Sequence, residues 1–187
     1  MNLPNDGLFI LFSSCVLIAA AILDLRYQKI PNALTFPTIL IALSYAGFTR
    51  GVDGLLFSTG GMFLGMATLI VPYLMGGMGA GDVKLMGAVG AILGPLGVVN
   101  AFVLTALIGV IYAVLVVLFN YKGSRGVAAR LTTIFKTLVR TGQFIYIPAP
   151  KGEEQPKLCY GIAIALGALC TIAWKLSHHS FLMSSFI

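Results

Sequence analysis

The feature that most constrains this chain is a series of apolar stretches that approach or exceed the length needed to cross a bilayer. About 20 apolar residues in helical conformation span the hydrocarbon layer. Charged residues make up only 10% of the chain, far below the level of about a quarter found in soluble domains. The sequence therefore predicts an all-α, polytopic integral membrane protein with a single domain over 1–187. We expect about six transmembrane helices, at 7–25, 32–48, 54–75, 83–94, 97–119 and 158–176.

The distribution of basic residues indicates the orientation of these spans, because cytoplasmic loops of membrane proteins are enriched in Lys and Arg. With the N-terminus outside, ten of the twelve basic residues fall on the inner side, and only Arg50 and Lys175 fall outside. Most of this excess lies in the cytoplasmic loop 120–157. The expected location is thus the inner (cytoplasmic) membrane, multi-pass, and the net charge of +6 does not require a nucleic-acid partner.

The same loop contains a candidate amphipathic helix at 125–140, with the sequence "RGVAARLTTIFKTLVR". Its apolar residues share one helical face, whereas Arg130, Lys136 and Arg140 lie on the opposite side. This pattern is typical of a helix that lies in the headgroup layer. We expect an interfacial anchor and spacer here, with docking of a substrate or partner as the alternative.

Two of the six acidic residues occupy unusual positions. Asp24 ends the first span and Asp82 opens the fourth, so the N-out topology places both at the cytoplasmic margin of the bilayer. As a helix, 83–94 measures about 18 Å, whereas the hydrocarbon layer is about 30 Å thick. Asp82 is therefore expected below the membrane surface, beside protein or water. An ionisable group at that depth is costly and indicates a function.

A glycine-rich turn containing Gly79 and Gly81 precedes Asp82 and favours irregular backbone. Such backbone at membrane depth is buried in protein or lines a watery cavity. The G-x-x-x-G patterns at 61–65 and 90–94 predict close helix packing around this glycine-rich turn. On this motif alone, a helix-capping Asp82 beside a flexible turn is an equal alternative.

Two carboxylates within a few ångströms share one proton, because repulsion and low dielectric keep both from ionising. The ionised member can take a proton from a water molecule that attacks a peptide carbonyl, while the protonated member polarises that carbonyl. This chemistry requires no metal or cofactor, so we expect none. The same two acids also suit a proton relay or a purely structural pair.

The extended motif "GGMGAGDVKLMGAVGAILG" at 76–94 resembles the GxGD signature of the type IV prepilin peptidases, which are membrane aspartic proteases. "DLR" at 24–26 followed by "IPN" at 30–32, and "YGIAIALGAL" at 160–169, are similar to other segments of that family in the same order. The resemblance implies that Asp24 and Asp82 form the catalytic pair. It also assigns site-shaping positions to Gly79, Gly81 and Lys84.

The resemblance further implies an intramembrane aspartic endopeptidase that removes the short basic leader from prepilin precursors at the cytoplasmic membrane face. Its partners would be prepilin or pilin-like substrates, membrane lipids and the pilus assembly machinery. The chain has no C-x-x-C pair, so the N-methyltransferase activity of larger members is not expected. The size is similar to the minimal peptidases of Flp (tight-adherence) pilus systems.

Two other functions stay open on physical grounds: a small proton-coupled transporter or channel with Asp24 and Asp82 as its relay, and a non-catalytic membrane subunit of pilus assembly. For Lys84, electrostatic tuning of the pair, or binding of a substrate carboxylate or phospholipid, stands beside simple snorkelling to the headgroups. Asn32 is expected to cap the second span.

Overall fold

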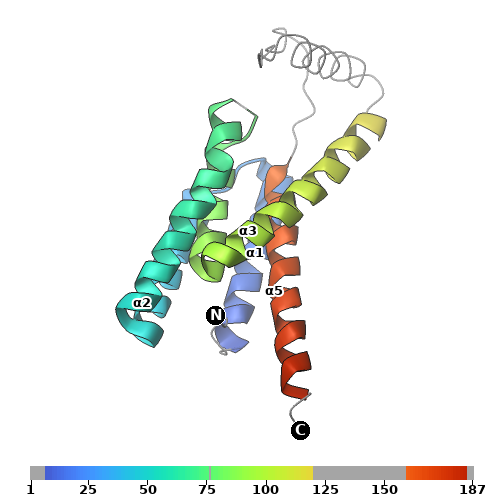
Figure 1. Cartoon of the computed structure of the whole chain (residues 1–187). Helices are drawn as coiled ribbons and strands as arrows, with labels where there is room; N and C mark the ends of the chain where they lie inside the picture. Colours follow the sequence, from blue (N-terminus) through green and yellow to red (C-terminus); the bar gives the residue numbers. More distant parts are fainter. Residues whose placement is uncertain (1–6, 76, 120–158, 185–187) are drawn as a thin grey trace, which may run out of the picture. The chain divides into compact units, whose positions relative to one another are not determined.

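The computed structural model describes residues 7–75, 77–119 and 159–184. All regular structure in these ranges is helical (Figure 1). The chain divides into one unit of residues 1–108 and 159–187 and a second of 109–158, and the packing below concerns the first unit. The loop 120–157 and the predicted interfacial helix at 125–140 lie outside the described residues. The helices are α1 (Gly7–Tyr27), α2 (Asn32–Leu74), α3 (Ala80–Phe119) and α5 (Tyr160–Ser184).

All four helices contain a segment long and apolar enough to cross a membrane. The prediction of an all-helical chain is therefore confirmed for the described part, and its helices are long and apolar enough to span a membrane. Two of these helices far exceed one bilayer thickness, since α2 has 43 residues and α3 has 40. At about 1.5 Å per residue they would measure about 60 Å if they were straight. Each is interrupted instead.

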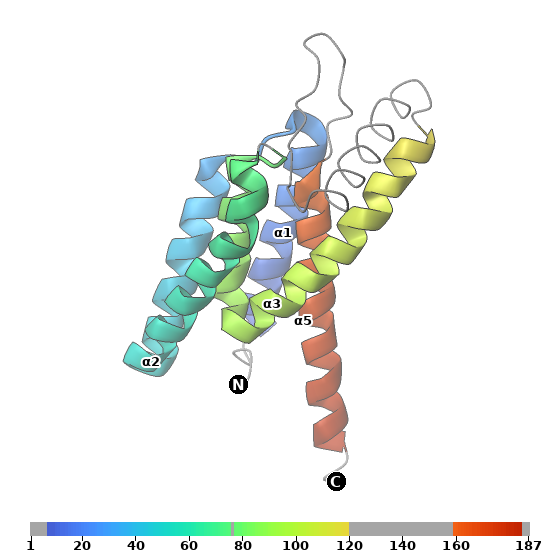
Figure 2. The same ribbon diagram turned by 45° about the horizontal axis from the view of Figure 1, so that its top comes forward.

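Both interruptions occur at a glycine with positive φ. Gly51 has φ 62° and Gly94 has φ 73°, a region that residues with a Cβ rarely adopt. Pro95 follows Gly94 at once and has no N–H to continue the helical hydrogen bonds. The helical stretches thus end close to the predicted span ends near 48 and 94. Figures 1 and 2 show the two stretches of α2 as limbs that lie side by side.

The break in α3 leaves carbonyl groups without helical partners, which is costly in an apolar environment. The ammonium group of Lys175, on α5, donates a hydrogen bond to the Leu93 carbonyl at 3.4 Å. The half-buried Lys175 thereby ties α5 to the end of the first stretch of α3.

A short return connects α1 to α2. Gln28 adopts φ 51°, and its N–H donates to the Asp24 carbonyl at 2.9 Å, which closes the end of α1. Pro31 then sits in an extended conformation immediately before α2. Ile30 lies between these residues and is buried. The return therefore holds Ile30 and its backbone a few residues after Asp24.

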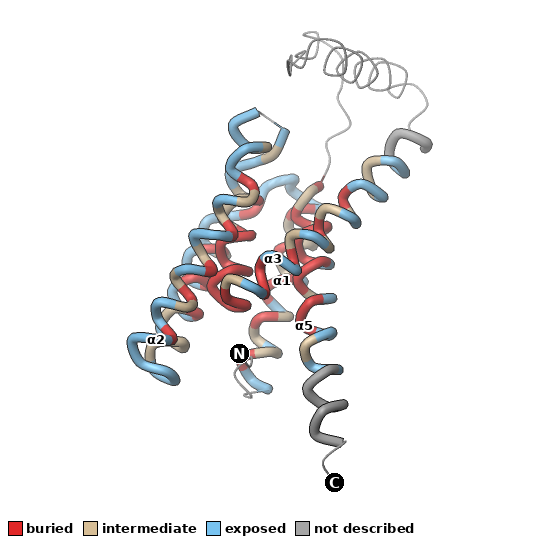
Figure 3. The backbone as a smooth tube through the Cα atoms, in the orientation of Figure 1, coloured by how far each residue is buried: buried red, intermediate tan, exposed pale blue. Residues whose placement is uncertain are grey.

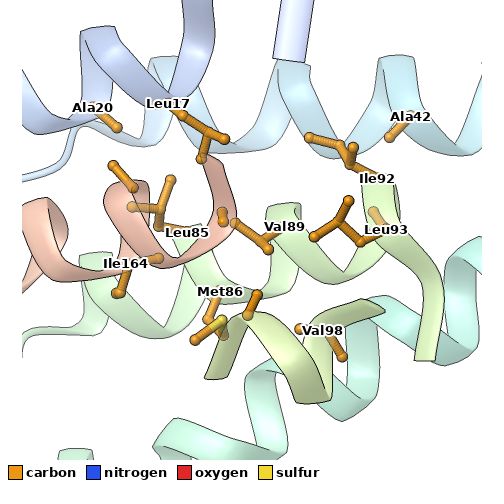
Figure 4. Close-up of a cluster of buried hydrophobic side chains, with 14 of the residues drawn as sticks. Leu17, Ala20, Ala42, Leu85, Met86, Val89, Ile92, Leu93, Val98 and Ile164 are labelled. Carbon is orange, nitrogen blue, oxygen red and sulfur yellow. The ribbon is translucent and has the colours of Figure 1, made fainter. Parts of the chain in front are cut away.

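The buried residues of the first unit lie where its helices face one another, and the outward surfaces of the helices carry the exposed residues, many of them large and apolar (Figure 3). Figure 4 shows Leu17 of α1 beside Leu85 and Val89 of α3 and Ile164 of α5. Lipid is as apolar as these side chains, so close packing rather than the hydrophobic effect stabilises such contacts in a membrane. α1 and α3 therefore share one core although they are far apart in the sequence.

The second stretch of α2 and the first stretch of α3 approach each other closely. A Cβ added to Gly61 would overlap the Gly90 carbonyl, and one added to Gly65 would overlap the Met86 carbonyl. The Ser58 hydroxyl donates to the Ala91 carbonyl at 2.7 Å across the same contact. The close packing predicted from the two G-x-x-x-G patterns is confirmed, and the two patterns pack against each other in antiparallel fashion.

Candidate active site

Asp24 lies in the last turns of α1 and is only 5% exposed. Its Oδ2 atom accepts a hydrogen bond of 2.8 Å from the backbone N–H of Gly161, at the start of α5. The Ile162 amide also donates to this carboxyl group. Backbone donors from the first turn of another helix therefore replace the water that a buried carboxylate would otherwise need.

Asp82 lies in the first turn of α3 and is 9% exposed. Its Oδ2 accepts from the Gly79 N–H at 3.1 Å, and its own N–H donates to the Gly79 carbonyl at 3.1 Å. This reciprocal pairing satisfies donors that a helix N-terminus leaves free, as in a capping box. The capping role considered for Asp82 from the sequence is therefore present, and it coexists with burial beside a second acid.

The structure brings the two acids to the same end of the first unit. Asp24 is one of the groups that act electrostatically on the Asp82 carboxyl. Asp82 acts in the same way on the half-buried Tyr160, the residue that precedes the Gly161 donor. Three helices, α1, α3 and α5, thus each supply a group to one small region. In the described ranges, no group of three or more His, Cys, Asp or Glu side chains is arranged to hold a metal ion.

The two motif glycines differ in their surroundings. A Cβ on Gly81 would lie 3.1 Å from the Ile30 Cβ and 3.3 Å from the Ile30 carbonyl oxygen. A Cβ on Gly79 would make an ordinary contact of 3.5 Å with Asp82 Oδ2. Gly81 therefore allows the turn before α3 to pack on the return that follows Asp24, whereas Gly79 contributes its amide to the Asp82 carboxylate.

Lys84 makes a specific contact rather than simply extending toward the headgroups. Its ammonium group donates to Asn32 Oδ1 at 2.8 Å and lies 5.2 Å from the centre of the Phe36 ring, a cation–π arrangement. The expectation that Asn32 caps α2 is wrong, because Pro31 occupies the cap position and no side chain caps the helix there. The Asn32 side chain is engaged by Lys84 instead, and this joins the first turns of α2 and α3.

Sequence reasoning did not assign two residues of this region, Tyr160 and Gly161. The resemblance of 160–169 to a family helix concerns the segment as a whole and gives no single position in it a role. A glycine in an apolar helix has many possible causes, so the sequence gives no signal that Gly161 contacts Asp24. Its role depends on a contact across 137 positions of the chain.

Comparison with known proteins identifies the family of this chain. A model described as the type IV leader peptidase family matches residues 11–114, which is more than half of the chain. The chain belongs to this family. Asp24, Asp82 and Lys84 lie inside the region that the type IV leader peptidase model matches, whereas Gly161 lies outside it.

Two proteins named prepilin leader peptidase/N-methyltransferase are similar to this type IV leader peptidase family member. The one from Xanthomonas campestris pv. campestris is 32% identical over 109 residues, which is 52% of this chain and 36% of that protein. The one from Bacillus subtilis (strain 168) is 33% identical over 113 residues, which is 59% of this chain and 45% of that protein. The matched regions therefore span less than half of either relative. No solved structure matches the chain.

Proposed function

We propose that this chain is an intramembrane aspartic endopeptidase that removes the leader from prepilin precursors, with Asp24 and Asp82 as its catalytic pair. The observation that carries the proposal is that two buried carboxyl groups, one on α1 and one on α3, lie in segments that pack together, since Gly81 contacts Ile30 in the return after α1. The electrostatic effect of Asp24 on Asp82 agrees with this placement. Membership of the type IV leader peptidase family supports the reaction class. The names of the two relatives support a prepilin as the substrate.

The proposed chemistry divides the work between the two acids. The ionised carboxylate accepts a proton from a water molecule as the water oxygen bonds to the scissile carbonyl carbon. The protonated carboxyl keeps its proton and donates a hydrogen bond to the carbonyl oxygen, which stabilises the negative charge of the tetrahedral intermediate. When the C–N bond breaks, the amine takes a proton from the pair, so the pair again holds one proton. The amides of Gly161 and Gly79 fix one oxygen of each acid and keep the pair in register.

The substrate would reach this site from the cytoplasmic face, with its basic leader at the anionic membrane surface. The scissile segment has to unwind there, because a helical carbonyl is already hydrogen-bonded and resists attack. The exposed side chains of Arg26 and Lys29 flank the end of α1 and suit anchoring to anionic lipid headgroups.

We also propose six membrane crossings with the N-terminus outside. The breaks at Gly51 and Gly94 support this number, because they divide α2 and α3 into two stretches each. The first stretch of α3, 80–93, would measure about 21 Å, less than the hydrocarbon thickness of about 30 Å. A helix that short supports a position for Asp82 beneath the headgroup level, where a dent in the membrane would admit water and substrate.

The test is leader removal from a co-expressed prepilin. Asp24→Asn and Asp82→Asn should each abolish processing while their amounts in the membrane stay normal, because Asn can neither accept nor donate the transferred proton. Asp53→Asn is the matched control, since Asp53 is exposed in α2 near the Gly51 break and should leave processing intact. Processing that survives either active-site change would refute the proposal. Gradient-driven proton flux in liposomes that is lost in both variants would favour the relay function instead.

A further inference from the structure

The contact between Gly161 and Asp24 is tighter than any side chain would allow. A Cβ added to Gly161 would lie 2.8 Å from Asp24 Oδ2 and 3.0 Å from both Cβ and Cγ of Asp24. These distances are below those of ordinary carbon contacts, about 3.5–4.0 Å between carbon atoms. Asp24 is 5% exposed and Gly161 is buried, so neither has free space into which to withdraw.

Because Gly161 has no side chain, its backbone comes within hydrogen-bonding distance of the Asp24 carboxylate. The Gly161 N–H reaches Asp24 Oδ2 at 2.8 Å, a length typical of a bond to a charged acceptor. The Cβ of an alanine at this position would be fixed to the backbone of α5 and could not rotate aside. The Asp24 carboxylate would therefore have to move away from the donor. The contact therefore sets where the Asp24 oxygens lie.

The fold supports Gly161 from the other end of α5 as well. Lys175 of α5 donates to the Leu93 carbonyl, at the end of the α3 stretch whose first turn contains Asp82. α5, whose Gly161 amide binds Asp24, is thus also tied to the stretch of α3 that carries Asp82.

We propose that Gly161 is a positioning residue, which holds the Asp24 carboxylate in its productive orientation through its backbone N–H and its lack of a side chain. The inference rests on the proposed peptidase function and deepens it. It assigns to the start of α5 a part in the reaction, although α5 contributes neither of the two acids. Its effect should appear in turnover rather than in substrate binding.

The experiment measures kcat and KM of the purified full chain on a prepilin, normalised to the folded, monodisperse fraction. Gly161→Ala should lower kcat about 100-fold and leave KM within about twofold, because a misplacement of about 1 Å at a reacting group costs this much. Gly167→Ala is the matched control on the same helix. Its Cβ would lie 2.7 Å from the Thr105 backbone nitrogen, away from both acids, so it should lower thermal stability and leave kcat of the folded fraction unchanged.

A second variant removes the donor without adding an atom that could clash. Cys159 allows a synthetic segment 159–187 to be ligated to residues 1–158, with an ester in place of the amide between Tyr160 and Gly161. Loss of a hydrogen bond to a charged group should lower kcat about tenfold or more. If Gly161→Ala does not fold, the kcat of the ester variant tests the positioning role of Gly161.

The outcomes separate the inference from the function on which it rests. Wild-type protein that cleaves no prepilin contradicts the proposed function. Wild-type cleavage that Asp24→Asn abolishes, together with wild-type kcat in the ester variant, overturns the positioning role alone. A fall in kcat for both Gly161 variants, with Gly167→Ala unaffected in turnover, supports it.

Discussion

The glycine contact between α2 and α3 yields a quantitative prediction about non-additivity. An added Cβ at Gly90 would overlap the Gly61 carbonyl and lie 2.6 Å from the Gly61 carbonyl carbon. An added Cβ at Gly61 would overlap the Gly90 carbonyl and lie 2.7 Å from the Gly94 Cα. Backbone blocks both positions, so either alanine forces the two helices apart. Both substitutions therefore require the same separation of α2 from α3.

The magnitude follows from this geometry. Overpacking a closely packed contact costs about 1–3 kcal/mol, and the gain in helix propensity from Gly to Ala offsets at most about 1 kcal/mol. Separation of the helices also strains the Ser58 bond to the Ala91 carbonyl, which is worth about 1 kcal/mol. Each single variant should thus lose about 1–3 kcal/mol. The double variant should lose about as much as the worse single one, because the first alanine has already made room for the second.

The assay is SDS titration of the protein in mild detergent micelles, followed by circular dichroism and by the fluorescence of Trp174, the only tryptophan in the chain. Gly47→Ala is the control: a Cβ there would meet nothing within 4 Å, so it should stabilise by about 0.5–1 kcal/mol. Costs that add in the Gly61→Ala/Gly90→Ala double variant would show that each glycine acts locally. The reasoning from a shared helix separation would then be wrong.

Two further predictions concern the Lys84 contact and the topology. Lys84→Met and Asn32→Ala should each cost about 1 kcal/mol or less, and the double variant should cost no more than either, because both remove one bond; additive losses would contradict a direct pair. In a cysteine-free background, an impermeant maleimide applied to spheroplasts should label Asp53→Cys at once and Lys29→Cys only after permeabilisation. The reverse pattern would overturn the N-out orientation.

The sequence by itself determined the class of protein and most helix boundaries. Long apolar stretches fix helical membrane segments, because backbone groups in lipid have to be hydrogen-bonded within the segment. Gly94 followed by Pro95 ends a helix for local reasons, as does the return around Pro31. Asp24 and Asp82 stood out because a buried acid is costly wherever the chain folds. The resemblance built on these positions agrees with the family found by comparison.

Only the tertiary structure decided which groups face one another. The Gly161 amide and Asp24 are 137 positions apart, and Lys84 and Asn32 are 52 apart. No local pattern encodes such pairs, since hydrophobic periodicity says which face of a helix is apolar but not which helix covers it. Asn32 shows the consequence: local rules predict a cap, whereas the neighbouring helix offers a charged donor that the side chain binds instead. The Gly161 contact forms through close backbone packing, which depends on shape in three dimensions.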